Sequence, residues 1–506
     1  MLSVLRRTSP RTPNLFPLLT TRSLAVAATA TKQTVRDRGP RKEGDISSVF
    51  ASLGGGEATP LPSRFAHVKQ NLLAPHHDVI SSSWTRLLSS LRSEIEHIST
   101  VGSDIIPSID YEQIGNHSRI KPFSYAVKKR GAAVIRGVVE LDVALGWKEE
   151  IREYIRTNPQ TKAFPKDNPA VYELYWSSSQ IKARTHPNVL STQSFLMSFW
   201  HSNDPNALIS TEHPVSYADR LRIRQPGDAG FALGAHVDGG SVERWEPEGY
   251  GRGGVYDKIW EGKWEDYDPW ESSCRLPVES DLYNGAGACS MFRMFQGWLS
   301  MSKTGPGEGT LLVNPLFKLA TAYFLLRPFF SPRNSDTGRS SFLDAENWIL
   351  DSTQDSLLQG ASLGCTQELN SALHPHLDLA KSMIHVPDVE PGDYVAWHCD
   401  SIHAVDKIHN GTGDSSVLYI PACPLTETNA SYLVRQREAF LSGTPGPDFP
   451  GGVGESCHVG RMGRDDVTAV GGVEGEKAMG LGVWIVEEGA TAGVKGVIRK
   501  ANGIVG

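Results

Sequence analysis

The stretch Leu221-Arg-Ile-Arg-Gln-Pro-Gly-Asp228, followed by Leu233-Gly-Ala-His-Val-Asp-Gly-Gly-Ser-Val-Glu-Arg-Trp245, decides the expected fold. In its first part apolar residues alternate with arginines, which is typical of a β-strand. Residues two apart on a strand point to the same face, so the side chains of His236 and Asp238 can reach one metal ion. A third ligand must then come from elsewhere in the chain.

The best third ligand is His403, in Pro391-Gly-Asp-Tyr-Val-Ala-Trp-His-Cys-Asp-Ser-Ile-His-Ala-Val405. Two histidines and one carboxylate on one side of a metal ion, with its other positions open, are typical of non-haem Fe(II) oxygenases. We therefore predict that His236, Asp238 and His403 are the metal ligands and the catalytic residues. His398 is the rival for the third position, and we favour His403 because it begins a new strand after a tight turn.

Short β-like runs separated by Gly/Pro turns surround these residues, for example Met291–Ser302, Tyr394–His398 and Ser416–Pro421. Around a metal triad they predict a mainly β fold with flanking α-helices, a double-stranded β-helix (jelly roll, cupin-like) core buttressed by helices. An apolar stripe from Trp84 to Ile98 at helical spacing predicts one of those helices.

We divide the chain into five parts. They are a mitochondrial transit peptide (1–36), a linker (37–60), a helical N-terminal part with a sheet-joining strand (61–205), the jelly-roll core (206–425), and a C-terminal helix with a Gly-rich extension (426–506). The transit peptide is predicted because residues 1–36 are rich in Arg, Ser and Thr and lack acidic residues. We therefore expect the protein in the mitochondrial matrix, with the cytoplasm as the alternative location. The aromatic-rich insertion 246–288 is either a lid over the site or a packed surface excursion.

The composition and charge of the chain limit the classes of molecule that it is expected to bind. The 506 residues carry a net charge of −7 and show no basic run on an expected helix face, which argues against nucleic-acid binding. No apolar stretch is long enough to span a bilayer. The six cysteines are scattered without a CxxC pair, which indicates neither a disulfide framework nor a zinc site. A small-molecule substrate is expected, and the sequence does not indicate an oligomeric state.

Three segments together resemble a known family. They are the stretch around His236, Met291-Phe-Arg-Met-Phe-Gln-Gly-Trp-Leu-Ser300 and Val417-Leu-Tyr-Ile-Pro-Ala-Cys-Pro424. The chain resembles the Fe(II)/2-oxoglutarate-dependent dioxygenase superfamily, nearest to its phytanoyl-CoA dioxygenase-like branch, and more closely the YbiU-like family of unknown function. The resemblance implies a jelly-roll oxygenase core, Fe(II), 2-oxoglutarate as co-substrate and O2. It implies no particular substrate.

One departure from the superfamily pattern concerns the co-substrate. Members that the chain resembles carry an Arg about ten residues after the distal His, whereas Asp414, Ser415 and Ser416 stand there in this chain. A buried dicarboxylate still needs a cation, and the planar fork of Arg suits it. The candidates for co-substrate binding are Arg224, Arg244, Arg293, Trp298 and Ser416. Arg222 is expected to face the substrate.

The sequence thus favours an oxidoreductase that oxidises, typically by hydroxylation, a small organic substrate. Two alternatives stay open. One is a cupin-type metal-dependent hydrolase or isomerase on the same triad, which the missing Arg favours. The other is a non-catalytic jelly-roll binding protein, which the intact triad disfavours.

Overall fold

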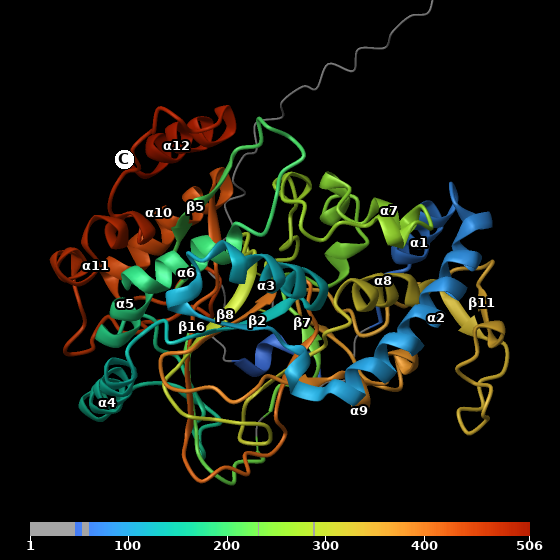
Figure 1. The fold of residues 1–506 in the computed structure, drawn as a ribbon, viewed down its shortest axis with the longest axis horizontal. Coiled ribbons are helices and arrows are strands. Elements are labelled where there is room, and N and C mark those ends of the chain that lie inside the picture. The colour runs from blue at the N-terminus through green and yellow to red at the C-terminus, as the bar shows by residue number, and fades with distance from the viewer. Residues whose placement is uncertain (1–45, 53–59, 231, 287–288) are drawn as a thin grey trace, which may run out of the picture. The chain divides into compact units, whose positions relative to one another are not determined.

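The computed structural model describes residues 46–52, 60–230, 232–286 and 289–506 of the chain. Two β-sheets carry most of the residues singled out above, and helices flank them (Figure 1). The predicted transit peptide, residues 1–36, lies outside the described residues.

The larger sheet has eight strands, which pair antiparallel except for the parallel pair β1 and β2. Its strand order is β1 (Ser108–Asp110), β2 (Ala132–Arg136), β14 (Tyr394–His398), β8 (Phe295–Ser300), β16 (Ser415–Tyr419), β6 (Leu221–Arg224), β4 (Val171–Tyr172) and β3 (Ala163–Phe164). This order brings segments from the two ends of the chain side by side.

The smaller sheet has five antiparallel strands. Its order is β12 (Gln367–Glu368), β7 (His236–Val237), β15 (His403–Val405), β9 (Leu311–Val313) and β13 (Ile384–His385). Two further strand pairs lie apart from it: β10 (Phe330–Pro332) with β11 (Trp348–Leu350), and β5 (Ile209–Val215) with β17 (Cys423–Thr426).

The alternation expected for strand β6 is present. Leu221 and Ile223 are buried in a hydrophobic cluster on one face of the larger sheet, whereas Arg222 lines a cavity on the other face. The neighbouring strand β16 repeats this pattern, with Leu418 in the cluster and Tyr419 at the cavity. Because residues of both sheets line this cavity, it lies between them.

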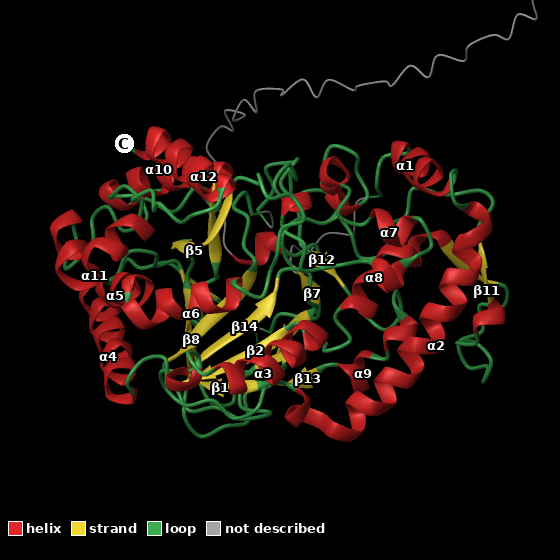
Figure 2. Ribbon diagram, turned by 45° about the horizontal axis from the view of Figure 1, so that its top comes forward, coloured by secondary structure: helices red, strands yellow, loops and turns green. Residues whose placement is uncertain are grey.

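Three helices cover the other face of the larger sheet. They are α3 (His117–Arg130), α4 (Leu141–Thr157) and α6 (Pro187–Met197), and each contributes side chains to the same cluster as Leu221. Figure 2 shows α3 and α6 in front of the strands β2, β8 and β14.

The other helices are α1 (Arg64–Leu73), α2 (His77–Val101), α5 (Ser178–Thr185), α7 (Asp257–Trp260), α8 (Lys318–Leu326), α9 (Leu379–Ser382), α10 (Glu427–Ser442), α11 (Arg464–Ala478) and α12 (Ala492–Val505). None of the described helices combines the length and apolar character needed to cross a bilayer.

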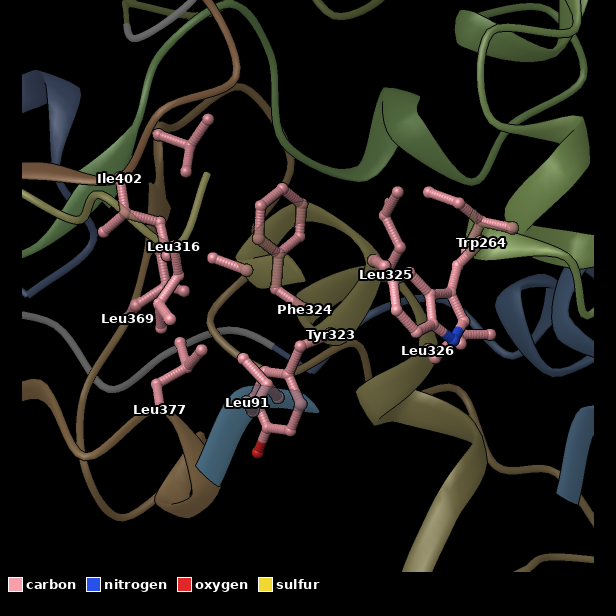
Figure 3. Close-up of a cluster of buried hydrophobic side chains, with 14 of the residues drawn as sticks. Leu91, Trp264, Leu316, Tyr323, Phe324, Leu325, Leu326, Leu369, Leu377 and Ile402 are labelled. Carbon is pink, nitrogen blue, oxygen red and sulfur yellow. The ribbon is translucent and has the colours of Figure 1, made fainter. Parts of the chain in front are cut away.

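The apolar stripe predicted for one helix is buried in α2. Its residues from Trp84 to Ile98 pack against α8, and Trp84 stacks on Tyr323 with ring centroids 5.4 Å apart. Figure 3 shows Leu91 of α2 near Tyr323, in a cluster that also contains Trp264. Each fully buried side chain of this kind contributes about 1.5–3 kcal/mol, so tertiary packing holds this helix in place.

The described part of the chain is a mixed α/β fold, not a mainly β one. Twelve α-helices accompany the sheets in that part, and the strand pairing closes neither sheet into a barrel. The largest departure is in the C-terminal part, for which the sequence predicts one helix and a Gly-rich extension. Helices α11 and α12 form there, because Gly471 and Gly475 let α11 approach Thr185 more closely than a Cβ atom would allow.

The aromatic insertion 246–288 is largely a packed part of the core. The side chains of Tyr250, Tyr256, Trp260, Trp264 and Tyr267 are buried in the hydrophobic cluster that contains α2 and α8. None of these aromatic residues lines the cavity between the sheets. This placement indicates that the insertion packs against the rest of the protein and favours that alternative over a lid above the cavity.

Candidate metal centre and its cavity

The three predicted metal ligands lie together. His236 of β7 is the direct cross-strand partner of His403 of β15, and Asp238 follows β7. Nε2 of His236 lies 3.7 Å from Asp238 Oδ1, and Nε2 of His403 lies 3.7 Å from Asp238 Oδ2. One nitrogen or oxygen atom from each residue falls within 4.8 Å of the others, so a single ion could contact all three.

Backbone contacts orient both imidazoles toward that point. Nδ1 of His236 lies 2.7 Å from the carbonyl oxygen of Gly234, and Nδ1 of His403 lies 3.2 Å from that of Ser401. A carbonyl oxygen only accepts, so each Nδ1 carries the proton and each Nε2 keeps its lone pair for a metal ion. This is the tautomer that a histidine ligand bound through Nε2 requires.

The electrostatics of the site favour a neutral His403 and an ionised Asp238. Burial lowers the pKa of His403 to about 3, and the neighbouring His236 acts in the same direction. Burial acts to raise the pKa of Asp238, but His403, His236 and Arg293 lower it below its ordinary value. Near neutral pH His403 therefore offers a lone pair and Asp238 a negative charge.

Apolar side chains enclose the two histidines. The ring of Phe50 meets His236 edge-on with centroids 4.9 Å apart, and Trp397 lies 5.0 Å from His403. Residues 46–52 belong to the segment that was expected to be a linker, and Ile46, Val49 and Phe50 form part of the cavity wall. The amide of Thr366 donates to the carbonyl oxygen of Val49 at 2.9 Å, which fixes this segment to the rest of the structure.

The cavity has a volume of about 120 Å³. Its polar lining residues other than the triad include Tyr217, Asp219, Arg220, Arg222, Arg293, Gln296, Trp298, Trp397, Tyr419 and Asp448. Such a mixture of apolar walls with a few convergent polar groups is typical of a small-molecule site.

Arg222 is the most distinctive of these residues. Its side chain is 2% exposed, yet its Nε and Nη2 atoms have no hydrogen-bond partner among the described residues. The Nε1 atoms of Trp298 and Trp397, on the same cavity wall, are also unpaired in the described structure. Burial lowers the pKa of Arg222 and the neighbouring Arg224 acts in the same direction, whereas Tyr419 acts to raise it, in part through a side-chain hydrogen bond. Buried donors without partners indicate a site for an acceptor-rich ligand.

The three arginines predicted for the co-substrate lie in different surroundings. Arg224 does not line the cavity, because it forms an ion pair with Asp228 at 2.6 Å and donates to the carbonyl oxygens of Asp406 and Lys407. Arg244 also lies outside the lining and donates to the carbonyl oxygens of Gly240 and, at 2.6 Å, Asp238. Arg293 does line the cavity.

The structure also shows where the other two residues predicted to bind the co-substrate lie. Trp298 faces the cavity, whereas Ser416 points away and donates to Asp414 at 2.6 Å. Asp414 is also held by Lys148 and Arg152 of α4, at 3.3 and 2.5 Å. The place where the superfamily pattern has an Arg is thus used here to attach β16 to α4.

The rival ligand His398 lies in a separate, fully paired environment. It stacks on Trp200 with centroids 4.6 Å apart, and its Nε2 lies 3.0 Å from the carbonyl oxygen of Pro269. Its Nδ1 accepts from the amide of Asp400 at 3.0 Å. Neither ring nitrogen is left for a metal ion.

A family model described as Gig2-like matches residues 59–481. The chain belongs to the Gig2-like family. It is 32% identical over 403 residues to the uncharacterized protein YbiU of Escherichia coli K12, across 77% of this chain and 89% of that protein.

Two crystal structures of similar proteins share the fold. GlcNAc Inducible Gene 2, GIG2 (DUF1479), from Candida albicans is 31% identical with a TM-score of 0.77, and the match covers 89% of this chain and 96% of that one. A hypothetical protein, JW0805, from Escherichia coli is 31% identical with a TM-score of 0.69, covering 83% and 98% of the two chains. These similarities support the predicted relationship to YbiU and give no activity.

Sequence reasoning missed two parts of this Gig2-like site. The first is the segment around Phe50, which lies far along the chain from the triad and carries no motif. The second is Arg220, which lines the cavity beside Arg222. The alternation of Arg220-Leu-Arg-Ile-Arg224 did place its arginines on one face, but only the fold shows which of them reach the cavity.

Proposed function

We propose that this member of the Gig2-like family is a non-haem Fe(II), 2-oxoglutarate-dependent dioxygenase that hydroxylates a small organic molecule. One observation carries the proposal. The two free Nε2 atoms and the Asp238 carboxylate converge in a cavity that also contains the buried guanidinium of Arg222, whose Nε and Nη2 atoms have no partner among the described residues. A metal triad and a cation for a carboxylate are the two elements that this chemistry requires of the protein.

The sheet arrangement supports a related proposal about the fold. The triad lies on adjacent strands of the smaller sheet, and the donors of Arg222, Trp298 and Trp397 come from the facing larger sheet. We propose that the two sheets are the halves of a double-stranded β-helix, in which ligands lie between the halves.

The residues present fit both absent groups. His236, Asp238 and His403 would hold Fe(II), and the remaining positions of the ion would be open to small ligands. When bound, Fe(II) and 2-oxoglutarate supply an oxidation in which 2-oxoglutarate, O2 and a C–H bond become succinate, CO2 and a C–OH group. The chain's own contribution is to orient the ligands, bind the carboxylate and exclude water.

Arg222 is the residue that we propose for the far carboxylate of 2-oxoglutarate, in place of the expected Arg224 or Arg244. Its fork of donors suits a carboxylate, and it lines the cavity from β6, next to β16. The unpaired indole Nε1 of Trp298 is a further donor on the same wall. Phe50 and Trp397 would keep water from the two histidines.

An anaerobic titration tests the proposal. Fe(II) and then 2-oxoglutarate are added to the purified protein, and the visible metal-to-ligand charge-transfer band is recorded. We expect a band that is lost in His236→Ala. In Arg222→Gln the affinity for 2-oxoglutarate should fall roughly ten- to hundredfold, the range for a hydrogen bond to a charged group.

Arg224→Lys is the matched control, because it keeps a cation beside Asp228 and lies outside the cavity lining. It should leave the affinity for 2-oxoglutarate unchanged. Stoichiometric metal binding without any band would contradict the proposal and favour a metal-dependent hydrolase or isomerase on the same triad. Absence of metal binding would favour a non-catalytic binding protein.

We also propose import into the mitochondrial matrix, on the composition of residues 1–36 alone. Fusion of these residues to a fluorescent protein should direct it to mitochondria. A fusion in which Arg6, Arg7, Arg11 and Arg22 are replaced by Gln should stay in the cytoplasm. A mitochondrial signal from that second fusion would contradict the proposal.

A further inference from the structure

We propose that the primary substrate is a small organic anion whose carboxylate or phosphate group is bound by Arg293. This inference rests on the proposed function, since it assigns Arg222 to the co-substrate and a second cation to the substrate.

Three arginines line the cavity, and they differ in what balances their charge. Arg220 lies 3.5 Å from both Glu173 and Asp219, so carboxylates of the protein already neutralise it. Arg222 keeps two nitrogen atoms, Nε and Nη2, without a partner among the described residues, and it is assigned to 2-oxoglutarate. Arg293 therefore decides whether the cavity has a positive charge left over for the substrate.

Arg293 has no hydrogen bond or ion pair within the described residues. Its guanidinium lies over the ring of Tyr217, 5.2 Å from the centroid, which is a favourable but weak contact for a cation. The nearby carboxylate of Asp448 is already engaged by Tyr217 Oη at 3.2 Å and by the amide of Ser290 at 2.9 Å. A half-buried guanidinium that faces a cavity without a carboxylate partner is suited to an anion that arrives with a ligand.

The position of Arg293 relative to the triad separates it from Arg222. Arg293 lies two residues before the start of β8, and it lines the same cavity as His236, Asp238 and His403. Arg222 lies on β6, on the wall that carries Tyr419. An anion held by Arg293 would thus lie in the cavity that contains the metal ligands, where the bond to be oxidised must also lie.

The rest of the lining limits what the anion is attached to. The walls of the cavity are partly apolar and include Ile46, Val49, Phe50, Leu233 and Val405. The expected substrate therefore carries an aliphatic part beside its carboxylate or phosphate group, and it is not a polycationic molecule.

Calorimetric titration of the anaerobic protein, saturated with Fe(II) and 2-oxoglutarate, tests this inference with three probes. Butyrate carries the carboxylate, methyl phosphate carries the phosphate, and butyramide is the neutral counterpart of butyrate. We expect at least one anion to bind and butyramide to bind at least about tenfold more weakly. Whichever anion binds more tightly identifies the headgroup.

Arg293→Gln should weaken anion binding at least about tenfold while the charge-transfer band with 2-oxoglutarate persists. Arg293→Lys should recover part of the affinity, because the charge remains but the fork geometry is lost. The exposed Arg339→Gln serves as the matched control and should change nothing.

The inference would be overturned if neither anion bound to the wild-type complex, or if Arg293→Gln bound the anion as tightly as the wild type. Loss of the 2-oxoglutarate band in Arg293→Gln with its retention in Arg222→Gln would overturn it as well, since the two arginines would have exchanged roles. If the wild-type protein gives no band but an anion still binds to the Fe(II) protein through Arg293, the co-substrate is wrong and the anion site stands.

Discussion

Two clusters in this molecule bring metal-ligand atoms equally close together, and only one of them is suited to hold an ion. The first is His236, Asp238 and His403, and the second is His398, Cys399 and Asp400. In both, the ligand atoms lie within 4.8 Å of one another. The difference is in what the atoms already bind.

In the second cluster every strong ligand has a partner. Asp400 pairs with Arg275 at 2.5 Å and accepts from Tyr256 and Tyr267, each at 3.1 Å. In the triad, by contrast, the backbone takes only the Nδ1 atoms, and both Nε2 atoms and the carboxylate point to one place. Ligand type and spacing are therefore insufficient evidence for a metal site, and free lone pairs facing a cavity are the stronger criterion.

The largest expected effect on stability lies in the paired cluster. Asp400→Asn would leave the buried guanidinium of Arg275 without its counter-charge, and breaking such a pair costs about 3–5 kcal/mol. Asp238→Asn should change the free energy of unfolding by less, because Asp238 has no such cationic partner in hydrogen-bonding contact among the described residues. Urea unfolding of both variants measures the difference. Equal destabilisation would remove the distinction between the clusters.

The ion pair between Asp400 and Arg275 also predicts that the stability of the fold depends on pH. Burial acts to raise the pKa of Asp400, but Arg275 and His398 lower it well below its ordinary value. The unfolded chain therefore takes up a proton at Asp400 before the folded protein does, so stability falls as the pH drops below about 4. The free energy of unfolding should fall less steeply between pH 5 and pH 2 in Asp400→Asn than in the wild type. If the free energy of unfolding depends on pH in the same way in both proteins, the lowered pKa of Asp400 is contradicted.

The next largest effect concerns metal affinity. Loss of groups that merely support a ligand costs about 10–100-fold in affinity, so removal of the ligand in His236→Ala should weaken Fe(II) binding by about 100-fold or more. His398→Ala is the contrasting variant. It should bind the metal normally while losing stability, because the ring stacked on Trp200 is lost. Equilibrium dialysis with Fe(II) gives both affinities, and normal binding by His236→Ala would refute the triad.

The same comparison shows which residues of the site could be predicted from the sequence. His236, Asp238 and His403 could be found because a strand's period of two and a strong distal segment fix them locally. Arg222 and Arg224 also lie two residues apart on a strand, so the sequence could not show which of them faces the cavity. The structure separates them, because the turn after β6 folds back and pairs Arg224 with Asp228, whereas Arg222 lines the cavity.

The parts that could not be predicted depend on contacts between distant segments. Phe50 reaches His236 only through the tertiary fold, and no local pattern marks it. Helices α11 and α12 were missed because glycine disfavours helices, whereas here the missing side chains permit close packing on α5 and on the backbone near Ala207. The proportion of helix was underestimated for the same reason.

The smallest expected effect concerns Arg244, which lies beside the triad without lining the cavity. Its guanidinium donates to the carbonyl oxygens of Gly240 and Asp238, and so holds the backbone that carries the metal-binding carboxylate. A lysine cannot reproduce this fork, so Arg244→Lys should weaken Fe(II) binding by about tenfold, at the low end of the range for supporting groups. Arg327→Lys is the matched control, because Arg327 is also buried and donates to two backbone carbonyl oxygens, those of Leu373 and Phe330, away from the cavity. Both variants lose comparable hydrogen bonds and should lose comparable stability, but only Arg244→Lys should lose metal affinity. If the two variants bind Fe(II) equally well, Arg244 stabilises the fold without positioning Asp238.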